Sequence, residues 1–228
     1  MDITLHYIEE GTGTPLLLLH GNGEDGTYFK HQLAYFSKKY RVIAVDTRGH
    51  GQSPRGAAPF TISQFAEDLN AFLEQRDISK AVILGFSDGA NIAMRFAMKH
   101  PEKVEALILN GGNLNARGVK ASVQIPIELG YRMTKLFSRI SEKARKNHEM
   151  LALMVDDPNI EPSELKEIHV PTLVIAGTED MIKEEHTKLL AAVIPGAELK
   201  FVKGGHFVAA KASEEFNAAV DLFLERVL

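Results

Sequence analysis

Short apolar runs alternate with longer segments of helical period along most of this chain, and that alternation constrains the fold more than any other feature. A short apolar run bounded by glycine, proline or charged residues is typical of a strand that is buried on both faces. Strands that alternate with helices form α/β units around a mostly parallel, doubly wound sheet with helices on both faces. We therefore expect parallel strands at residues 16–19, 41–45, 81–84, 104–109, 172–176 and 198–202, and an antiparallel edge strand at residues 3–8.

Two segments carry apolar stripes at helical spacing, and the first of them follows Thr61 and Ser63, either of which can cap a helix. Residues 113–166 break the alternation, because they contain helical candidates but no good strand. A long excursion between two strands of such a sheet predicts a small helical lid over an active site. The two stripes consist of Ile62, Phe65, Ala66, Leu69, Phe72 and Leu73, and of Phe216, Ala219, Val220, Phe223 and Val227.

The composition is that of an ordinary globular chain. With 228 residues, 45% of them hydrophobic and 25% charged, residues 1–228 can form a single domain with a sizeable core. A formal net charge of −4 gives no reason to expect nucleic acid or a membrane as partner, and the absence of cysteine excludes disulfides and thiolate zinc sites. The first residues lack a basic segment followed by an apolar one, so we expect no signal peptide and a cytoplasmic protein. The oligomeric state cannot be predicted from these data.

The most informative motif is the sequence GFSDG at residues 85–89, which follows the expected strand at 81–84 and precedes a helical segment. In this strand–turn–helix context, G-x-S-x-G is typical of a nucleophilic serine at the tip of a sharp turn. The turn forces Ser87 toward positive φ, and side chains at Gly85 and Gly89 would collide in it. The helix that follows directs its N-terminus at a developing oxyanion. The alternative interpretation is a purely structural turn.

A serine hydroxyl needs a base and an acid that orients the base. His206 and Asp180 each follow an expected strand, so both should lie at the carboxyl edge of the sheet, where Ser87 also emerges. We expect Asp180 to orient His206, with Glu179 as the alternative acid; a helix cap is the alternative role of His206. For the oxyanion we expect the main-chain amides of Asn22 and Asp88.

The chain contains five motifs: HGNG at 20–23, DTRGHGQS at 46–53, GFSDG at 85–89, GTED at 177–180 and GGH at 204–206. Together they resemble the α/β-hydrolase superfamily, and most of all its small bacterial esterases and peroxidase-like (perhydrolase) members. The resemblance covers nearly the whole chain. It implies the α/β-hydrolase fold, the Ser87–His206–Asp180 triad, oxyanion donors at Asn22 and Asp88, no cofactor and no metal. The acidic Asp88 departs from the apolar residue or glutamine that relatives often have there.

From these features we expect a carboxylesterase for small to medium acyl esters, with a small-molecule acyl substrate as its partner. We also expect that Phe86, Asn113, Phe137 and Phe207 contact this substrate. The family turn at residues 46–53 is mainly structural, so no catalytic role is assigned to its side chains. Which ester, thioester, lactone, C–C bond or perhydrolysis substrate is used cannot be predicted, because selectivity depends on the lid.

Two other functions remain open. The sequence GNGEDG at residues 21–26 matches the dinucleotide-binding pattern G-x-G-x-x-G, and Asp46 has the position of the acid that binds the ribose, so an NAD(P)-dependent oxidoreductase is one alternative. That alternative leaves the placement of Ser87, Asp180 and His206 unexplained. The second alternative is a ligand receptor or signalling protein that has the same fold but little or no turnover.

The lid is basic, with eight lysine and arginine residues and two glutamates between residues 117 and 146. We interpret the basic residues as the solvated side of helices whose other side contains Met133, Leu136, Phe137 and Ile140. The alternative is a basic lid that attracts anionic acyl substrates.

Overall fold

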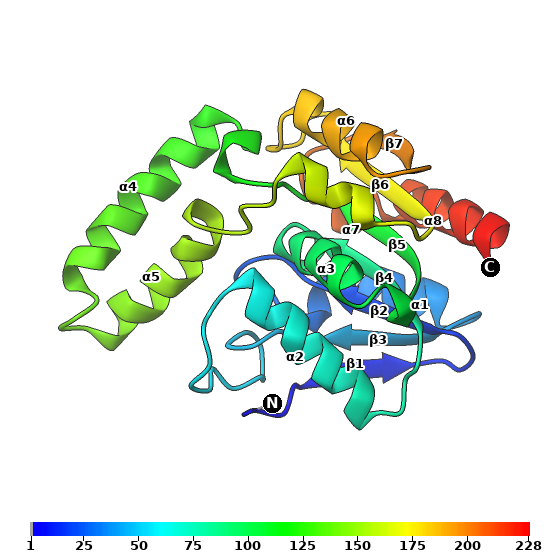
Figure 1. Ribbon diagram of the computed structural model, residues 1–228, viewed down its shortest axis with the longest axis horizontal. Coiled ribbons are helices and arrows are strands. Elements are labelled where there is room, and N and C mark those ends of the chain that lie inside the picture. Colours follow the sequence, from blue (N-terminus) through cyan, green and yellow to red (C-terminus); the bar gives the residue numbers. More distant parts are fainter. Residues whose placement is uncertain (1) are drawn as a thin grey trace.

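A seven-stranded sheet forms the centre of the computed structural model, which describes residues 2–228 (Figure 1). The strand order is β1-β3-β2-β4-β5-β6-β7. All neighbours pair in parallel except β1, which pairs antiparallel with β3 at one edge. The mostly parallel, doubly wound sheet is therefore confirmed. Its strands are β1 (Tyr7–Glu10), β2 (Pro15–Leu19), β3 (Arg41–Val45), β4 (Ala81–Phe86), β5 (Val104–Asn110), β6 (Thr172–Gly177) and β7 (Glu198–Val202).

The six parallel strands lie where the apolar runs predict them, whereas the edge strand does not. We expected it at residues 3–8, and it runs from Tyr7 to Glu10. The reason is its partner: the β1–β3 ladder begins at the pair Tyr7 and Val45, and Val45 is the last residue of β3. Residues before Tyr7 therefore have no β3 residue to pair with, although Leu5 is still buried in the core.

Helices cover both faces of the sheet. One core cluster joins the sheet to α2 (Ile62–Gln75), α3 (Asp88–Lys99) and α6 (Glu184–Val193), and the other joins it to α1 (Lys30–Phe36), α7 (Val208–Lys211) and α8 (Ser213–Val227). The expected cap of α2 is present, since the Thr61 side chain accepts a hydrogen bond from the Gln64 amide. Short 3₁₀ helices lie at η1 (Gly26–Phe29), η2 (Pro101–Lys103), η3 (Ala116–Gly118) and η4 (Pro162–Glu167).

A helical hairpin occupies the position predicted for the lid, between β5 and β6. It consists of α4 (Ala121–Phe137) and α5 (Glu142–Val155), which pack along each other and extend away from the sheet at the left of Figure 1. We call α4 and α5 the arm. No helix in residues 2–228 combines the length and the apolar character needed to cross a membrane.

One side of the arm differs from the pattern expected of a packed helix. The apolar side of a partly solvated helix normally faces a core, but Met133, Leu136, Phe137 and Ile140 are all exposed. The helix periodicity was therefore correct, whereas the burial that such periodicity usually implies is absent.

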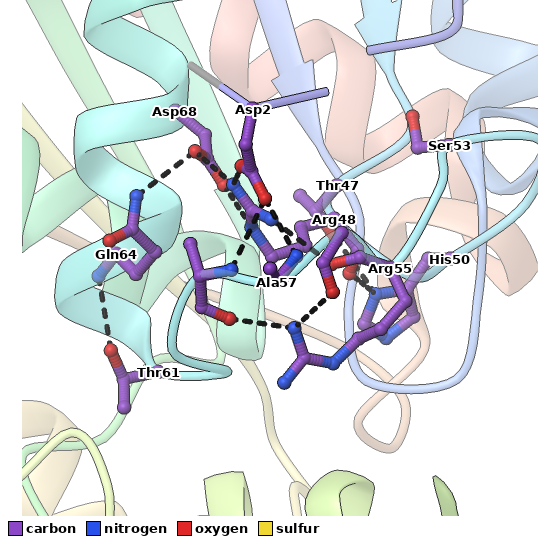
Figure 2. A network of polar contacts seen from close by, with 12 residues as sticks. Asp2, Thr47, Arg48, His50, Ser53, Arg55, Ala57, Thr61, Gln64 and Asp68 are labelled. Atoms are coloured by element: carbon purple, nitrogen blue, oxygen red, sulfur yellow. Dashed lines mark hydrogen bonds and ion pairs between the residues drawn. The ribbon is translucent and has the colours of Figure 1, made fainter. Parts of the chain in front are cut away.

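A buried ion-pair network holds the turn at residues 46–53 (Figure 2). Arg48 is fully buried and donates two hydrogen bonds of 2.7 Å to the Asp68 carboxylate on α2, and a third of 2.6 Å to Asp2. Figure 2 shows its guanidinium between these two carboxylates. The neighbouring Thr47 amide donates to Nε2 of His20, so this network also supports the loop at residues 20–23.

Candidate active site

Ser87 lies in a strained turn between β4 and α3. Its φ is 53° and its ψ is −117°, a backbone conformation that a serine adopts only when its surroundings impose it. The Ser87 amide donates to the Asn110 carbonyl on β5 at 2.8 Å, which anchors the turn. Glycine is required on both sides: a Cβ on Gly85 would overlap the Gly89 carbonyl, and one on Gly89 would overlap the Leu19 carbonyl.

His206 and Asp180 lie next to this serine, although both are distant from it in sequence. Nε2 of His206 is 3.0 Å from Oγ of Ser87, and Nδ1 of His206 is 2.7 Å from Oδ1 of Asp180. Both side chains are buried. The three residues thus form one chain of hydrogen bonds at the carboxyl ends of β4, β6 and β7.

Asp180 is held ionised by its hydrogen bonds. Burial alone would raise its pKa, but the His206 ring and the amides of Ile182 and Gly177 favour the carboxylate, and the net result is a lowered pKa. An ionised Asp180 accepts a hydrogen bond from the Nδ1–H group of His206, which leaves Nε2 unprotonated and able to take the hydroxyl proton of Ser87. Glu179, the alternative acid, is exposed, and its side chain makes no hydrogen bond within residues 2–228.

The two expected oxyanion donors lie on facing segments. Within residues 2–228, the main-chain amides of Asn22 and Asp88 donate to no protein acceptor, so both are free to bind another oxygen. Side chains connect the two segments, because Nδ2 of Asn22 donates to Oδ2 of Asp88 and to the carbonyl of Met150 on α5, each at 2.9 Å. One asparagine therefore joins the loop after β2, the start of α3 and the arm.

Two carboxyl groups near these donors are hard to ionise. Burial raises the pKa of Asp88 to about 6, with the Asn22 hydrogen bond opposing the rise and the charge of Asp157 adding to it. Burial also raises the pKa of Glu24 to about 6, although its Oε2 accepts a hydrogen bond from the Gly21 amide. Near neutral pH the two groups bring negative charge close to the serine.

The four residues expected to contact substrate have different surroundings. Phe86 is buried and packs its ring 4.8 Å from that of His206, and Phe207 is 42% exposed with its ring 5.5 Å from the same imidazole. Asn113 is buried and exchanges hydrogen bonds with Asn91, so its polar groups are used inside the protein. Phe137 ends α4 at the far end of the arm. Only Phe207 therefore combines exposure with direct contact to the imidazole.

Two further residues, for which the sequence predicts no role, pack against the site. Gly111 follows β5 with a φ of 61°, and a Cβ there would lie 2.8 Å from the His206 ring and 3.4 Å from an Asp180 oxygen. Glu24 braces the loop that carries the Asn22 amide. The glycine pair at 111–112, which begins one residue beyond the expected strand at 104–109, is a sequence signal that indicates a close approach of backbone at Gly111.

The hydrogen bonds of Asp46 conflict with the dinucleotide-binding alternative. Oδ1 of Asp46 accepts from the Gly26 amide at 2.7 Å, and Oδ2 accepts from the Gln52 amide and lies 2.8 Å from Nδ1 of His6. Both oxygens therefore hold loops together instead of facing a ribose site. Within residues 2–228, no group of three or more histidine, aspartate or glutamate side chains is arranged to hold a metal ion.

Comparison with known proteins assigns the family. The model of the α/β-hydrolase fold family matches residues 14–128. An uncharacterised protein of Mycobacterium tuberculosis is 35% identical over 119 residues, which are 52% of this chain but only 34% of that protein. The 3-oxoadipate enol-lactonase 2 of Acinetobacter baylyi is 25% identical over 253 residues, covering 99% of this chain and 94% of the enzyme.

The fold has close counterparts among solved structures. A bromoperoxidase from Bacillus anthracis superposes with a TM-score of 0.80 at 24% identity, covering 98% of this chain and 96% of that one. At this identity the likeness concerns the fold alone. With the family match over half of its length and the full set of strands in place, the chain belongs to the α/β-hydrolase fold family.

Proposed function

We propose that this chain is a serine hydrolase that cleaves carboxylic esters of small to medium acyl groups through an acyl-enzyme intermediate. The observation that carries the proposal is the continuous hydrogen-bond chain from Ser87 through His206 to Asp180. A serine hydroxyl is a weak nucleophile on its own, and such a chain is the usual means of activating it. The similarity to an enzyme named an enol-lactonase supports hydrolysis as the general reaction.

In the first half-reaction, Oγ of Ser87 attacks the ester carbonyl while Nε2 of His206 takes the hydroxyl proton. The carbonyl oxygen becomes negative and accepts hydrogen bonds from the free amides of Asn22 and Asp88. The C–O bond to the alcohol then breaks, and His206 returns the proton to the departing alcohol oxygen. Asp180 holds the imidazole in the required tautomer and stabilises its cation.

The second half-reaction uses the same groups in reverse. Water takes the place of the alcohol, and His206 removes one of its protons as it attacks the acyl-serine carbonyl. The same two amides stabilise the second oxyanion. Ser87 leaves as the hydroxyl after receiving the proton from His206, and the carboxylic acid is released.

The charges around the site favour an uncharged acyl group. Asp88 follows the nucleophile directly and Glu24 braces the oxyanion loop, so an anionic acyl group would meet negative charge above about pH 6. The exposed ring of Phe207 beside the imidazole offers an apolar contact to such a group. We therefore infer that neutral esters are preferred over anionic esters of the same length.

A panel of p-nitrophenyl esters tests this proposal. The panel spans acetyl to decanoyl groups and includes one ester with a terminal carboxylate, and each is assayed with wild type and Ser87→Ala. We expect kcat/KM to be highest for neutral esters and to fall by at least about three orders of magnitude in Ser87→Ala. Saturable binding of these esters without turnover would instead indicate a ligand-binding protein and overturn the proposal.

A further inference from the structure

The outer face of α4 carries a continuous apolar stripe. Its helical members recur every three or four residues, which places them on one side of the helix. Leu136 is 78% exposed, and Ile140, in the turn that follows α4, is 81% exposed. Isolated exposed apolar residues are common on protein surfaces, but a contiguous stripe usually marks a binding face. The stripe consists of Ile125, Leu129, Met133 and Leu136 on α4, continued by Ile140 in the turn after it.

The stripe is not the side on which α4 contacts α5. Tyr131 stacks on His148 of α5 with ring centroids 4.6 Å apart, and the Thr134 hydroxyl lies 3.4 Å from Nδ1 of the same histidine. These residues occupy the inner side of α4. The packing of the arm is therefore already satisfied without the stripe.

Cationic side chains lie on α4, in the turn after it and at the start of α5. Five exposed ones form no ion pair within residues 2–228, whereas Lys146 pairs with Glu142 on its own helix. Over residues 121–155, which span the arm, there are six basic and three acidic residues, in a chain whose formal net charge is −4. The arm is thus a cationic segment on an otherwise acidic protein. The five are Arg132, Lys135, Arg139, Lys143 and Arg145.

We propose that this face of the arm docks on an anionic lipid bilayer. An amphipathic helix with a large apolar stripe and a lysine- and arginine-rich border lies in the interfacial plane of such a membrane, where the apolar side chains insert and the cations meet lipid headgroups. An open groove of about 460 Å³ lies between the end of α4 and the start of α5, and its lining combines apolar and polar side chains with one lysine. The lining residues are Met133, Thr134, Phe137, Ile140, Ser141, Lys143, Ala144 and Asn147. That combination suits an acyl chain below an anionic headgroup.

Charge complementarity favours the bilayer over a second copy of this chain. Two copies that met through this face would bring Arg132, Lys135 and Arg139 of one against the same cations of the other. The net charge of the whole chain predicts no membrane partner, but it averages over an arm and a body of opposite sign. A membrane surface interacts mainly with the local charge of the arm, because at about 0.1 M salt screening limits the reach of each charge to about 10 Å.

Co-sedimentation with vesicles tests the proposal. Wild type is mixed with vesicles of phosphatidylcholine alone and of phosphatidylcholine with about one quarter phosphatidylglycerol. We expect at least about tenfold tighter binding to the anionic vesicles, lost at about 0.5 M salt. Equal binding to both vesicle types, or binding to neither, overturns the proposal.

Variants locate the contact. The triple variant Arg132→Gln, Lys135→Gln, Arg139→Gln should weaken binding to anionic vesicles by about 100-fold, at roughly fivefold per charge. The pair Leu136→Asn, Ile140→Asn should weaken it by at least about tenfold. The matched control is Leu222→Asn, a 59% exposed leucine on α8, which should bind like wild type.

The same variants distinguish a lipid surface from self-association. All are checked for native circular dichroism, and their mass in solution is measured by light scattering. A wild-type dimer that becomes monomeric in Leu136→Asn, Ile140→Asn, without vesicle binding by either, would assign the stripe to a dimer interface and refute membrane docking.

Discussion

Replacing Asp88 by asparagine removes a buried charge and keeps the shape of the side chain. Asp88 is 8% exposed, and its Oδ2 accepts a hydrogen bond of 2.9 Å from Asn22. Burial raises its pKa from an ordinary value of 3.8 to about 6. Because an asparagine oxygen can accept the same hydrogen bond, the change isolates the effect of the charge.

The sign of the effect follows from the direction of this pKa. Below pH 3.8 the carboxyl is protonated in both the folded and the unfolded chain, so its ionisation has no effect on stability. Between that pH and about 6 the unfolded chain releases its proton first, and the free energy of unfolding falls. Above about pH 6 the full penalty is present. It amounts to about 3 kcal/mol, at about 1.4 kcal/mol per pH unit between the two pKa values.

Urea unfolding followed by circular dichroism measures this penalty. We expect the free energy of unfolding of Asp88→Asn to exceed that of wild type by up to about 3 kcal/mol at pH 8, and by less than about 1 kcal/mol at pH 4. Glu179→Gln, which removes an exposed carboxylate, serves as control and should show no such difference. An Asp88→Asn variant that is less stable than wild type at pH 8, or whose difference is the same at both pH values, would refute the reasoning.

Three further predictions concern the site and its support. Asp180→Asn should lower kcat/KM for a neutral ester by about four orders of magnitude, because an amide there stabilises the wrong imidazole tautomer, while Glu179→Gln should stay near wild type; the reverse ranking would move the acid by one residue. Gly111→Ala places a methyl group 2.8 Å from that imidazole on a backbone with φ of 61°, so kcat should fall at least about tenfold, and an unchanged kcat would contradict this. Arg48→Met leaves the buried Asp68 carboxylate without its partner and should lower the free energy of unfolding by about 3–5 kcal/mol in urea titrations, a loss below about 1 kcal/mol being the contrary result.

The central strands could be located from sequence because both of their faces are covered. Each residue of such a strand must then be apolar, as in β2, where Leu16 to Leu19 are at most 1% exposed. The edge strand has no such requirement, and its start depends on where β3 ends. The exposed stripe of α4 shows the same limit, since helical periodicity indicates one apolar side but not whether anything covers it.

The positions of Ser87, Asp180 and His206 could be predicted because each follows a strand, and parallel strands bring their carboxyl ends to one edge. The surroundings of these residues depend on contacts between distant segments. The packing of Gly111 against the imidazole and the support of the oxyanion loop by Glu24 are of this kind. Phe137 was expected at the substrate, but α4 carries it to the end of the arm.

The assignment of Ser87 as nucleophile is tested most directly by covalent labelling. Wild type, Ser87→Ala and the exposed-serine control Ser122→Ala are treated with a fluorophosphonate, and their intact masses are measured. We expect a single adduct on wild type and on Ser122→Ala, located on the peptide that contains Ser87, and none on Ser87→Ala. A Ser87→Ala protein that is labelled as fast as wild type would contradict the account.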